Sequence, residues 1–151
     1  MDNDNKQTLK FMKCREGAVL PTKALTKDTG YDLTLLGIEK TLPSGVILYR
    51  TGIKTKPPEG FYLDLLPRSS MTKTGYILAH SVGVIDEHYI GELFVPLYKI
   101  NKDMSDLEFP IKLCQLVVRR RYDFDVEEVF SLDETERSSG GFGSTDSQKK
   151  V

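Results

Sequence analysis

Short apolar or alternating runs recur along the chain, separated by turn residues, and no window of a dozen residues keeps a helical period. Val, Ile, Tyr and Phe are frequent in these runs and suit pleated, half-buried surfaces. The pattern predicts strands over Leu9–Cys14, Tyr31–Leu36, Val46–Thr51, Phe61–Leu66, Ile77–Ala79, Glu92–Ile100 and Leu113–Tyr122. A short helix is predicted at Ser70–Thr74, with Ser69 or Ser70 capping its start and Gly75 its end. These elements predict an all-β jelly roll, sandwich or barrel with one short helix.

The length of 151 residues predicts one domain with a substantial core. We expect this domain to cover residues 1–136, with residues 1–8 frayed, and a Gly/Ser-rich tail to cover residues 137–151. The 39% hydrophobic and 28% charged residues are typical of a soluble globular protein.

Charge and cysteine content exclude several classes of protein. The net charge is -1, which gives no general attraction to nucleic acid or anionic membranes. No apolar segment approaches membrane-spanning length, and the first residues lack the layout of a signal peptide. We therefore expect a soluble intracellular protein with two reduced cysteines, Cys14 and Cys114. The His and Cys spacing predicts no zinc site, and the absence of a G-x-S-x-G elbow disfavours an acyl-transfer hydrolase.

The run from Arg137 to Thr145 combines one Arg, three Gly, four hydroxyl residues and one aromatic ring, Phe142. Gly loses the most conformational entropy on ordering, so this run cannot form a packed element by itself. One interpretation is a disordered solubilising tail. The other is a mobile flap, in which Phe142 stacks on a flat group while Arg137, the hydroxyls and the glycine amides bind phosphate.

Two further segments carry candidate chemistry. In Gly83–Glu92 we expect a hairpin with Asp86 at one shoulder and the ring of Tyr89 three residues later. The Pro67–Ser70 segment, at the predicted helix start, places an Arg beside exposed amides, which suits an anion. Each segment alone also has a structural explanation, as a turn carboxylate with a rim aromatic or as a helix cap beside a surface Arg.

Taken in order, five segments closely resemble the motifs of the trimeric dUTPase family, spread over Lys10 to Thr145. They are Gly30-Tyr31-Asp32-Leu33, Pro67-Arg68-Ser69-Ser70, Gly83-Val84-Ile85-Asp86 with Tyr89 and Gly91, Lys112-Leu113-Cys114-Gln115-Leu116, and Arg137 to Thr145. The resemblance implies a jelly-roll-like subunit that forms a homotrimer with three active sites at subunit interfaces. It implies a dUTP diphosphatase that uses Mg²⁺ to hydrolyse dUTP to dUMP and pyrophosphate, which limits uracil in DNA and supplies dUMP for thymidylate synthesis.

The resemblance also implies a role for each matching residue. Asp86 matches the catalytic carboxylate that activates water, and Tyr89 matches the ring beneath the deoxyribose that excludes a 2′-hydroxyl. Asp32 matches a carboxylate that contacts the metal indirectly, through water. The residues that match contacts to the uracil edge are Ser81, Val82, Gly83, Val84 and Ile85, with His80 beside them. Those that match contacts to phosphate are Arg68, Ser69, Ser70 and Gln115, and those that match the flap from another subunit are Arg137, Phe142, Gly143, Ser144 and Thr145.

The chain departs from the family pattern at several positions. His80 stands where many relatives carry an Asn that binds uracil, Ser138 replaces a usual Gly, and Asp146 stands where Gly is common. The approach to Gln115, Phe109–Lys112, lacks the usual Gly-Asp-Arg.

Two other functions fit the same fold. A dCTP deaminase resembles this pattern, but it carries a catalytic Glu five residues after the glycine, where this chain has Pro96, and a Trp where this chain has Tyr89. A nucleotide-sensing regulatory protein is the second alternative, because fold does not fix function.

Overall fold

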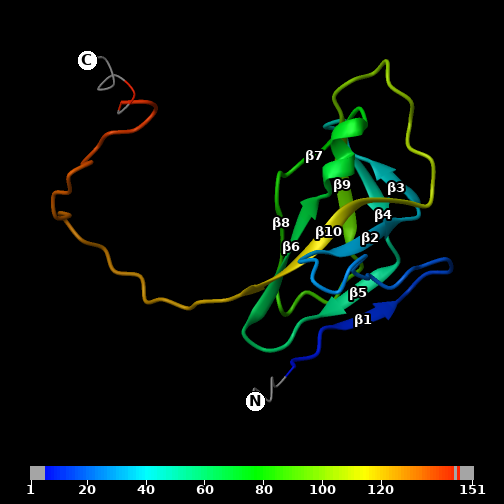
Figure 1. Cartoon of the computed structure of the whole chain (residues 1–151), viewed down its shortest axis with the longest axis horizontal. Coiled ribbons are helices and arrows are strands. Elements are labelled where there is room, and N and C mark those ends of the chain that lie inside the picture. Colours follow the sequence, from blue (N-terminus) through cyan, green and yellow to red (C-terminus); the bar gives the residue numbers. More distant parts are fainter. Residues whose placement is uncertain (1–5, 145, 147–151) are drawn as a thin grey trace.

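Two four-stranded antiparallel sheets pack against each other, and a two-stranded ribbon lies beside them, in the computed structural model of the chain (Figure 1). The structure describes residues 6–144 and residue 146. The first sheet has the order β2 (Tyr31–Leu35), β10 (Ile111–Arg120), β6 (Phe61–Pro67) and β8 (Gly83–Ile85). The second has the order β3 (Gly37–Thr41), β4 (Ile47–Arg50), β9 (Phe94–Lys99) and β7 (Tyr76–Leu78). The ribbon pairs β1 (Lys10–Lys13) with β5 (Ile53–Lys56).

Side-chain alternation along the strands builds the core. In β2, Leu33 and Leu35 are fully buried, and across the core Val95 and Leu97 of β9 are fully buried as well. Each such side chain stabilises the fold by about 2 kcal/mol through removal of apolar surface from water. The period of two along β2 places Asp32 and the buried Thr34 on the face of the sheet opposite to Leu33 and Leu35.

The predicted all-β class with one short helical element is confirmed within the described residues, but three strands were missed. These are β3, β5 and β8. β3 buries only its first residue, β5 alternates with lysines, and β8 has three residues, so each gives a weak hydrophobic signal. None of the helices in residues 6–144 is long and apolar enough to span a membrane.

The helical element is a 3₁₀ turn, η1 (Ser69–Lys73), and both predicted caps are wrong. Arg68 occupies the N-cap position and no side-chain hydrogen bond caps the start. At the other end Thr74 has an extended backbone, and its hydroxyl donates to the Met71 carbonyl at 2.7 Å. Gly75 is needed for space, because a Cβ there would lie 2.7 Å from the Asn101 carbonyl oxygen.

The predicted hairpin over Gly83–Glu92 is also wrong. β8 pairs with β6, whereas β9 pairs with β4 and β7 in the other sheet. The segment between them, which we call the crossing loop (residues 86–93), therefore passes from one sheet to the other. Because its two flanking strands find their partners elsewhere, they cannot pair with each other as a hairpin requires.

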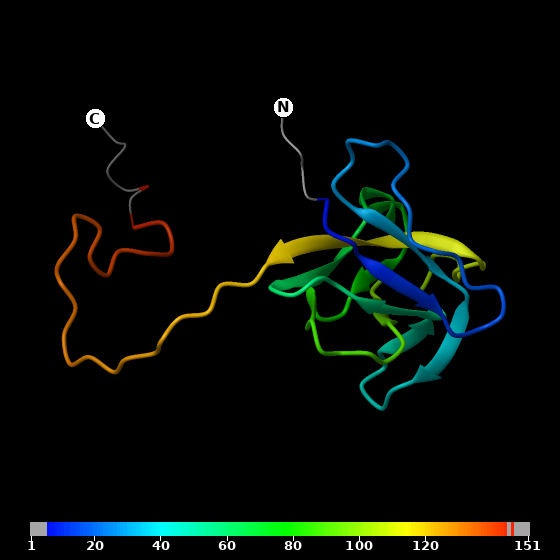
Figure 2. The ribbon, with the colours of Figure 1, turned by 90° about the horizontal axis from the view of Figure 1, so that it is seen from below.

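Beyond Arg120 the chain leaves the sheets as an extended segment that runs away from them (Figures 1 and 2). Its apolar side chains lie in solvent, among them Phe124, Val126, Phe130 and Leu132. The domain boundary that we expect at residue 136 stays a prediction.

Candidate active site

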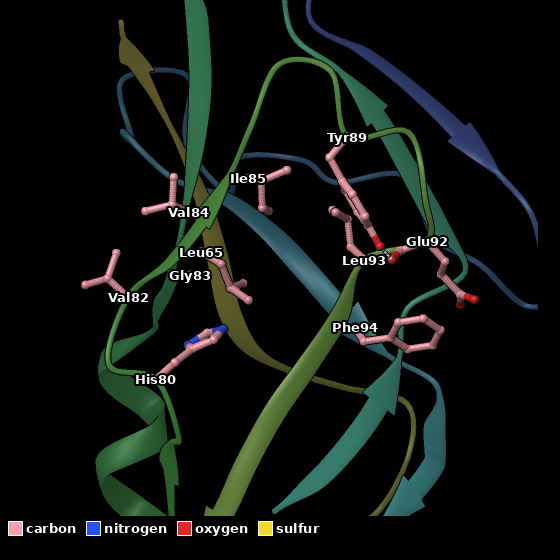
Figure 3. Close-up of a pocket in the computed structure, with 10 residues that line it drawn as sticks. All are labelled: Leu65, His80, Val82, Gly83, Val84, Ile85, Tyr89, Glu92, Leu93 and Phe94. Atoms are coloured by element: carbon pink, nitrogen blue, oxygen red, sulfur yellow. Dashed lines mark hydrogen bonds between the residues drawn. The ribbon is translucent and has the colours of Figure 1, made fainter.

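A cavity of about 250 Å³ opens between β8, the crossing loop and the start of β9 (Figure 3). Most of its walls are apolar, as suits a flat, weakly polar ring. The residues that line it are Leu65, His80, Val82, Gly83, Val84, Ile85, Tyr89, Glu92, Leu93 and Phe94. The structure therefore brings together six of the residues that the sequence predicted for the base and sugar.

A strained turn at Ser81 joins His80 and Val82, two residues that line this cavity. Ser81 has a φ of 62°, in the left-handed region that residues with a side chain rarely adopt. The Val82 amide donates to the His80 carbonyl at 2.6 Å, which closes a three-residue turn. Such strain persists only where the surrounding structure enforces it, and it is frequent at ligand sites.

The turn holds the His80 ring over Gly83, and Figure 3 shows the ring pointing into the cavity. A Cβ on residue 83 would lie 2.8 Å from His80 Cε1, so only glycine leaves room for the ring. Burial lowers the pKa of His80 below its usual value. The imidazole is therefore neutral at neutral pH and offers one donor and one acceptor nitrogen to a bound base.

Tyr89 forms the opposite wall. Its hydroxyl donates to the Glu92 carbonyl at 2.8 Å, and its amide donates to the Asp86 carbonyl at 3.1 Å. The ring lies against Gly91, where a Cβ would come within 2.7 Å of Tyr89 Cζ. These contacts fix the ring as a rigid wall of the cavity.

Asp86 immediately follows β8 and is exposed. Within the described residues, no donor binds its carboxylate. Asp86 follows Ile85, which lines the cavity, and an exposed, unpaired carboxylate is available to accept a proton from water.

A second group of predicted residues gathers where β2, β6 and β10 meet. Arg68 Nε lies 3.0 Å from Asp32 Oδ1, and Arg68 Nη1 donates to the Lys112 carbonyl at 2.9 Å. Gln115 is paired with Asp32 across the strands and donates to the Pro67 carbonyl at 3.1 Å. A Cβ on Gly30 would overlap Gln115 Oε1, so glycine at this position lets the Gln115 side chain lie where it does.

The serines of this group face different ways. Ser69 is exposed, and it lines a shallow depression with Pro67, Arg68 and Ser81. The Ser70 hydroxyl is buried and has no hydrogen-bond partner among the described residues. A phosphate can therefore reach the Ser69 side chain directly, whereas the Ser70 hydroxyl is covered.

The tail does not reach either group in its own chain. The C-terminal segment that holds Arg137, Phe142, Gly143 and Ser144 runs far from the two sheets (Figure 2), and the Phe142 ring is fully exposed. Arg137 Nε donates to the Gly140 carbonyl at 2.7 Å. Thr145 lies outside the described residues.

The described residues contain no cluster of three or more His, Cys, Asp or Glu side chains that could hold a metal. Asp32, the predicted indirect ligand, is a single carboxylate that is already paired with Arg68.

Four residues of the cavity were not predicted as site residues: Leu65, Glu92, Leu93 and Phe94. The three apolar ones read as ordinary strand or core positions, and nothing in the sequence distinguishes them. Glu92 directly follows Gly91 of the Gly83–Gly91 motif, and this position in the sequence could have indicated that Glu92 lies at the site.

Comparison with known proteins gives consistent matches. The family model described as dUTPase matches residues 16–146. The rat deoxyuridine 5′-triphosphate nucleotidohydrolase is 37% identical over 139 residues, which cover 91% of this chain and 67% of the rat protein. The enzyme of the same name from Clostridioides difficile is 35% identical over 138 residues, covering 91% of this chain and 96% of that protein. A solved dUTPase of Staphylococcus bacteriophage 80alpha, with dUpNHpp, has a TM-score of 0.79 over 93% of this chain and 99% of its own, at 20% identity.

Proposed function

Because this chain belongs to the dUTPase family, we propose that it hydrolyses dUTP to dUMP and pyrophosphate, with Asp86 as the catalytic base. The observation that carries the proposal is the cavity of about 250 Å³, which has the fixed Tyr89 ring in its wall and is lined by Ile85, the residue before the exposed Asp86. In the cell such an activity limits uracil incorporation into DNA and supplies dUMP.

The cavity accounts for recognition of the nucleoside. Uracil lies against the backbone of Ser81–Ile85, and the neutral His80 ring supplies a further hydrogen bond to the base. The deoxyribose packs on the Tyr89 ring. A 2′-hydroxyl would be pressed against this ring without a partner, and an unpaired polar group costs binding energy.

The chemistry is water attack on a phosphate. Asp86 accepts a proton from the attacking water, because a positioned carboxylate can act as a general base. The charge that develops on the phosphate oxygens is stabilised by donors, which matter more in phosphoryl transfer than a covalent nucleophile. In this proposal Arg68, Ser69 and Gln115 supply these donors, and Arg137 supplies another when the flap closes.

Mg²⁺ is the expected cofactor, and when bound it neutralises negative charge on the triphosphate. Asp32 would contact it through water, which fits its existing pair with Arg68. The substrate phosphates would supply the direct ligands.

We propose a homotrimer in which each active site is shared between subunits. The tail of a single chain runs away from its own cavity, so its flap residues can act only after a large movement or at another subunit (Figure 1). The segment before the flap exposes large apolar side chains, and Val126 and Phe130 are 99% and 98% exposed. Apolar groups so fully exposed in a segment of this length indicate a surface that another chain covers.

The two alternatives make different products. The deaminase alternative would release ammonia from dCTP, but Pro96 in β9 cannot transfer a proton at the position of that family's Glu. The regulatory alternative would bind nucleotide without rapid turnover. Assays of ammonia from dCTP and of pyrophosphate from dUTP separate the three functions.

Tyr89→Ala should lower the ratio of kcat/KM for dUTP to kcat/KM for UTP by about 10-fold, mainly because kcat/KM for dUTP falls. The reason is that the ring both packs on deoxyribose and fills the space of a 2′-hydroxyl. Measurement of kcat/KM for both nucleotides checks this. Tyr89→Phe is the matched control: it keeps the ring, loses only the hydroxyl bond to Glu92, and should retain most of the discrimination. An unchanged ratio in Tyr89→Ala would refute the role of the ring.

A further inference from the structure

Glu87, the residue after Asp86, joins three segments that are distant in sequence. Its Oε2 accepts the backbone N–H of Gly60 at 3.1 Å and Arg121 Nη1 at 2.7 Å. Lys56 Nζ lies 3.9 Å from its Oε1. The crossing loop is thereby tied to the end of β5, to the turn before β6 and to the residue that follows β10.

Backbone contacts make the same junction rigid. Lys56 Nζ donates to the Glu87 carbonyl at 3.1 Å, and the Arg121 amide donates to the Gly60 carbonyl at 2.8 Å. Gly60 has a φ of 83°, which glycine adopts without strain. The Gly60 N–H that binds Glu87 is thus held in place by a turn whose backbone conformation favours glycine.

This carboxylate differs from an ordinary surface charge. Its side chain is 18% exposed, whereas Asp123, the other acidic partner of Arg121, is 80% exposed. The pKa of Glu87 is lowered below its usual value, most strongly by the hydrogen bond from the Gly60 N–H and also by Arg121 and Lys56. Glu87 therefore stays ionised and bonded throughout the neutral pH range.

No donor in the described residues binds the Asp86 carboxylate, so its position is set by the backbone of the crossing loop, where the Tyr89 amide donates to the Asp86 carbonyl at 3.1 Å. On one side its backbone is fixed by β8, which pairs with β6 through Leu63 and Ile85. At the far end of the crossing loop, the Glu92 carboxylate accepts the Gly52 amide at 2.8 Å. Between these two points Glu87 is the acidic side chain that anchors the loop beside Asp86.

We propose that Glu87 is a positioning residue that holds Asp86 in its catalytic orientation through Gly60 and Arg121. This inference rests on the proposed function, in which Asp86 activates water. Displacement of a catalytic group by about 1 Å can cost on the order of 100-fold in rate, so a change at Glu87 should act on turnover more than on substrate binding.

The test compares dUTP hydrolysis by the full chain and its variants. Glu87→Gln keeps the size and an acceptor for Gly60 but loses the ion pair with Arg121. We expect its kcat to fall about 10-fold, with KM for dUTP changed less than about twofold. Asp123→Asn is the matched control, since it removes the other acidic partner of Arg121 and should leave kcat unchanged.

A double-mutant cycle separates positioning from a merely structural role. If Glu87 acts through Asp86, Glu87→Gln should not lower kcat further in an Asp86→Asn background. Melting temperature reports folding of each variant. Should Glu87→Gln be unstable, Arg121→Gln removes the same pair from the partner side and should give the same loss and the same non-additivity.

The outcomes are distinct. If Glu87→Gln has the same kcat as Asp123→Asn while Asp86→Asn is impaired, the positioning role is overturned and the proposed function stays intact. If Glu87→Gln lowers kcat by the same factor in the wild-type and the Asp86→Asn backgrounds, the positioning role is also overturned, because Glu87 would then act independently of Asp86. A wild-type chain without dUTP hydrolysis overturns the proposed function and this inference with it.

Discussion

Asp86→Asn should slow turnover by on the order of 10²–10⁴-fold, the usual range for loss of a general base. The amide has nearly the same shape but cannot accept a proton from water. Because no donor binds this carboxylate in the described residues, the substitution breaks no contact and should leave folding unchanged. Single-turnover hydrolysis of dUTP measures the rate of the chemical step directly.

Binding should be much less affected than turnover. The affinity of a non-hydrolysable dUTP analogue for Asp86→Asn should stay close to that of the wild-type chain. Asp103→Asn serves as a control, since Asp103 is an exposed carboxylate in a turn outside the candidate site. Near wild-type turnover in Asp86→Asn would remove Asp86 from the mechanism.

Truncation after Glu136 should remove most of the hydrolysis while leaving the melting temperature and oligomeric state close to those of the full chain. The removed residues include no strand among those described and bury little apolar surface. Ordering such a segment costs roughly 1–2 kcal/mol per residue, so it closes only when contacts with substrate repay that entropy. Steady-state hydrolysis and thermal melting of the two proteins check this.

Phe142→Ala in the full chain should give an intermediate loss, because stacking on the base is removed while the phosphate donors remain. Lys149→Ala, which alters the sequence beyond the flap residues, is the control and should resemble the wild type. Normal hydrolysis by the truncated protein would mean that the segment is a plain disordered tail.

The sequence predicted the class of the fold because the long strands carry strong patterns. β6 and β10 each hold several buried apolar residues and were found within a few residues of their bounds. The crossing loop was mistaken for a hairpin, because local turn residues do not reveal that β8 and β9 have partners in different sheets. Strand pairing between distant segments is set by the whole core, and a local pattern does not contain it.

The site residues that belong to sequence motifs could be predicted, whereas those that reach the site through packing of distant strands could not. Asp86, Tyr89 and Gly83 stood in a recognisable motif. Leu65 and Phe94 enter the cavity only because β6 and β9 approach each other beside the loop. The buried hydroxyl of Ser70 likewise depends on how η1 packs, which the residues Pro67–Ser70 alone do not indicate.

The most direct test of the account is pyrophosphate release by the purified full chain with Mg²⁺ and each of dUTP, dTTP, dCTP and UTP. We expect dUTP to be hydrolysed with a kcat/KM that exceeds those of the other three by about 100-fold or more, and dUMP to be the second product. Equal rates with all four nucleotides, or no pyrophosphate from dUTP, would contradict the assignment of the cavity to deoxyuridine and of Asp86 to its hydrolysis.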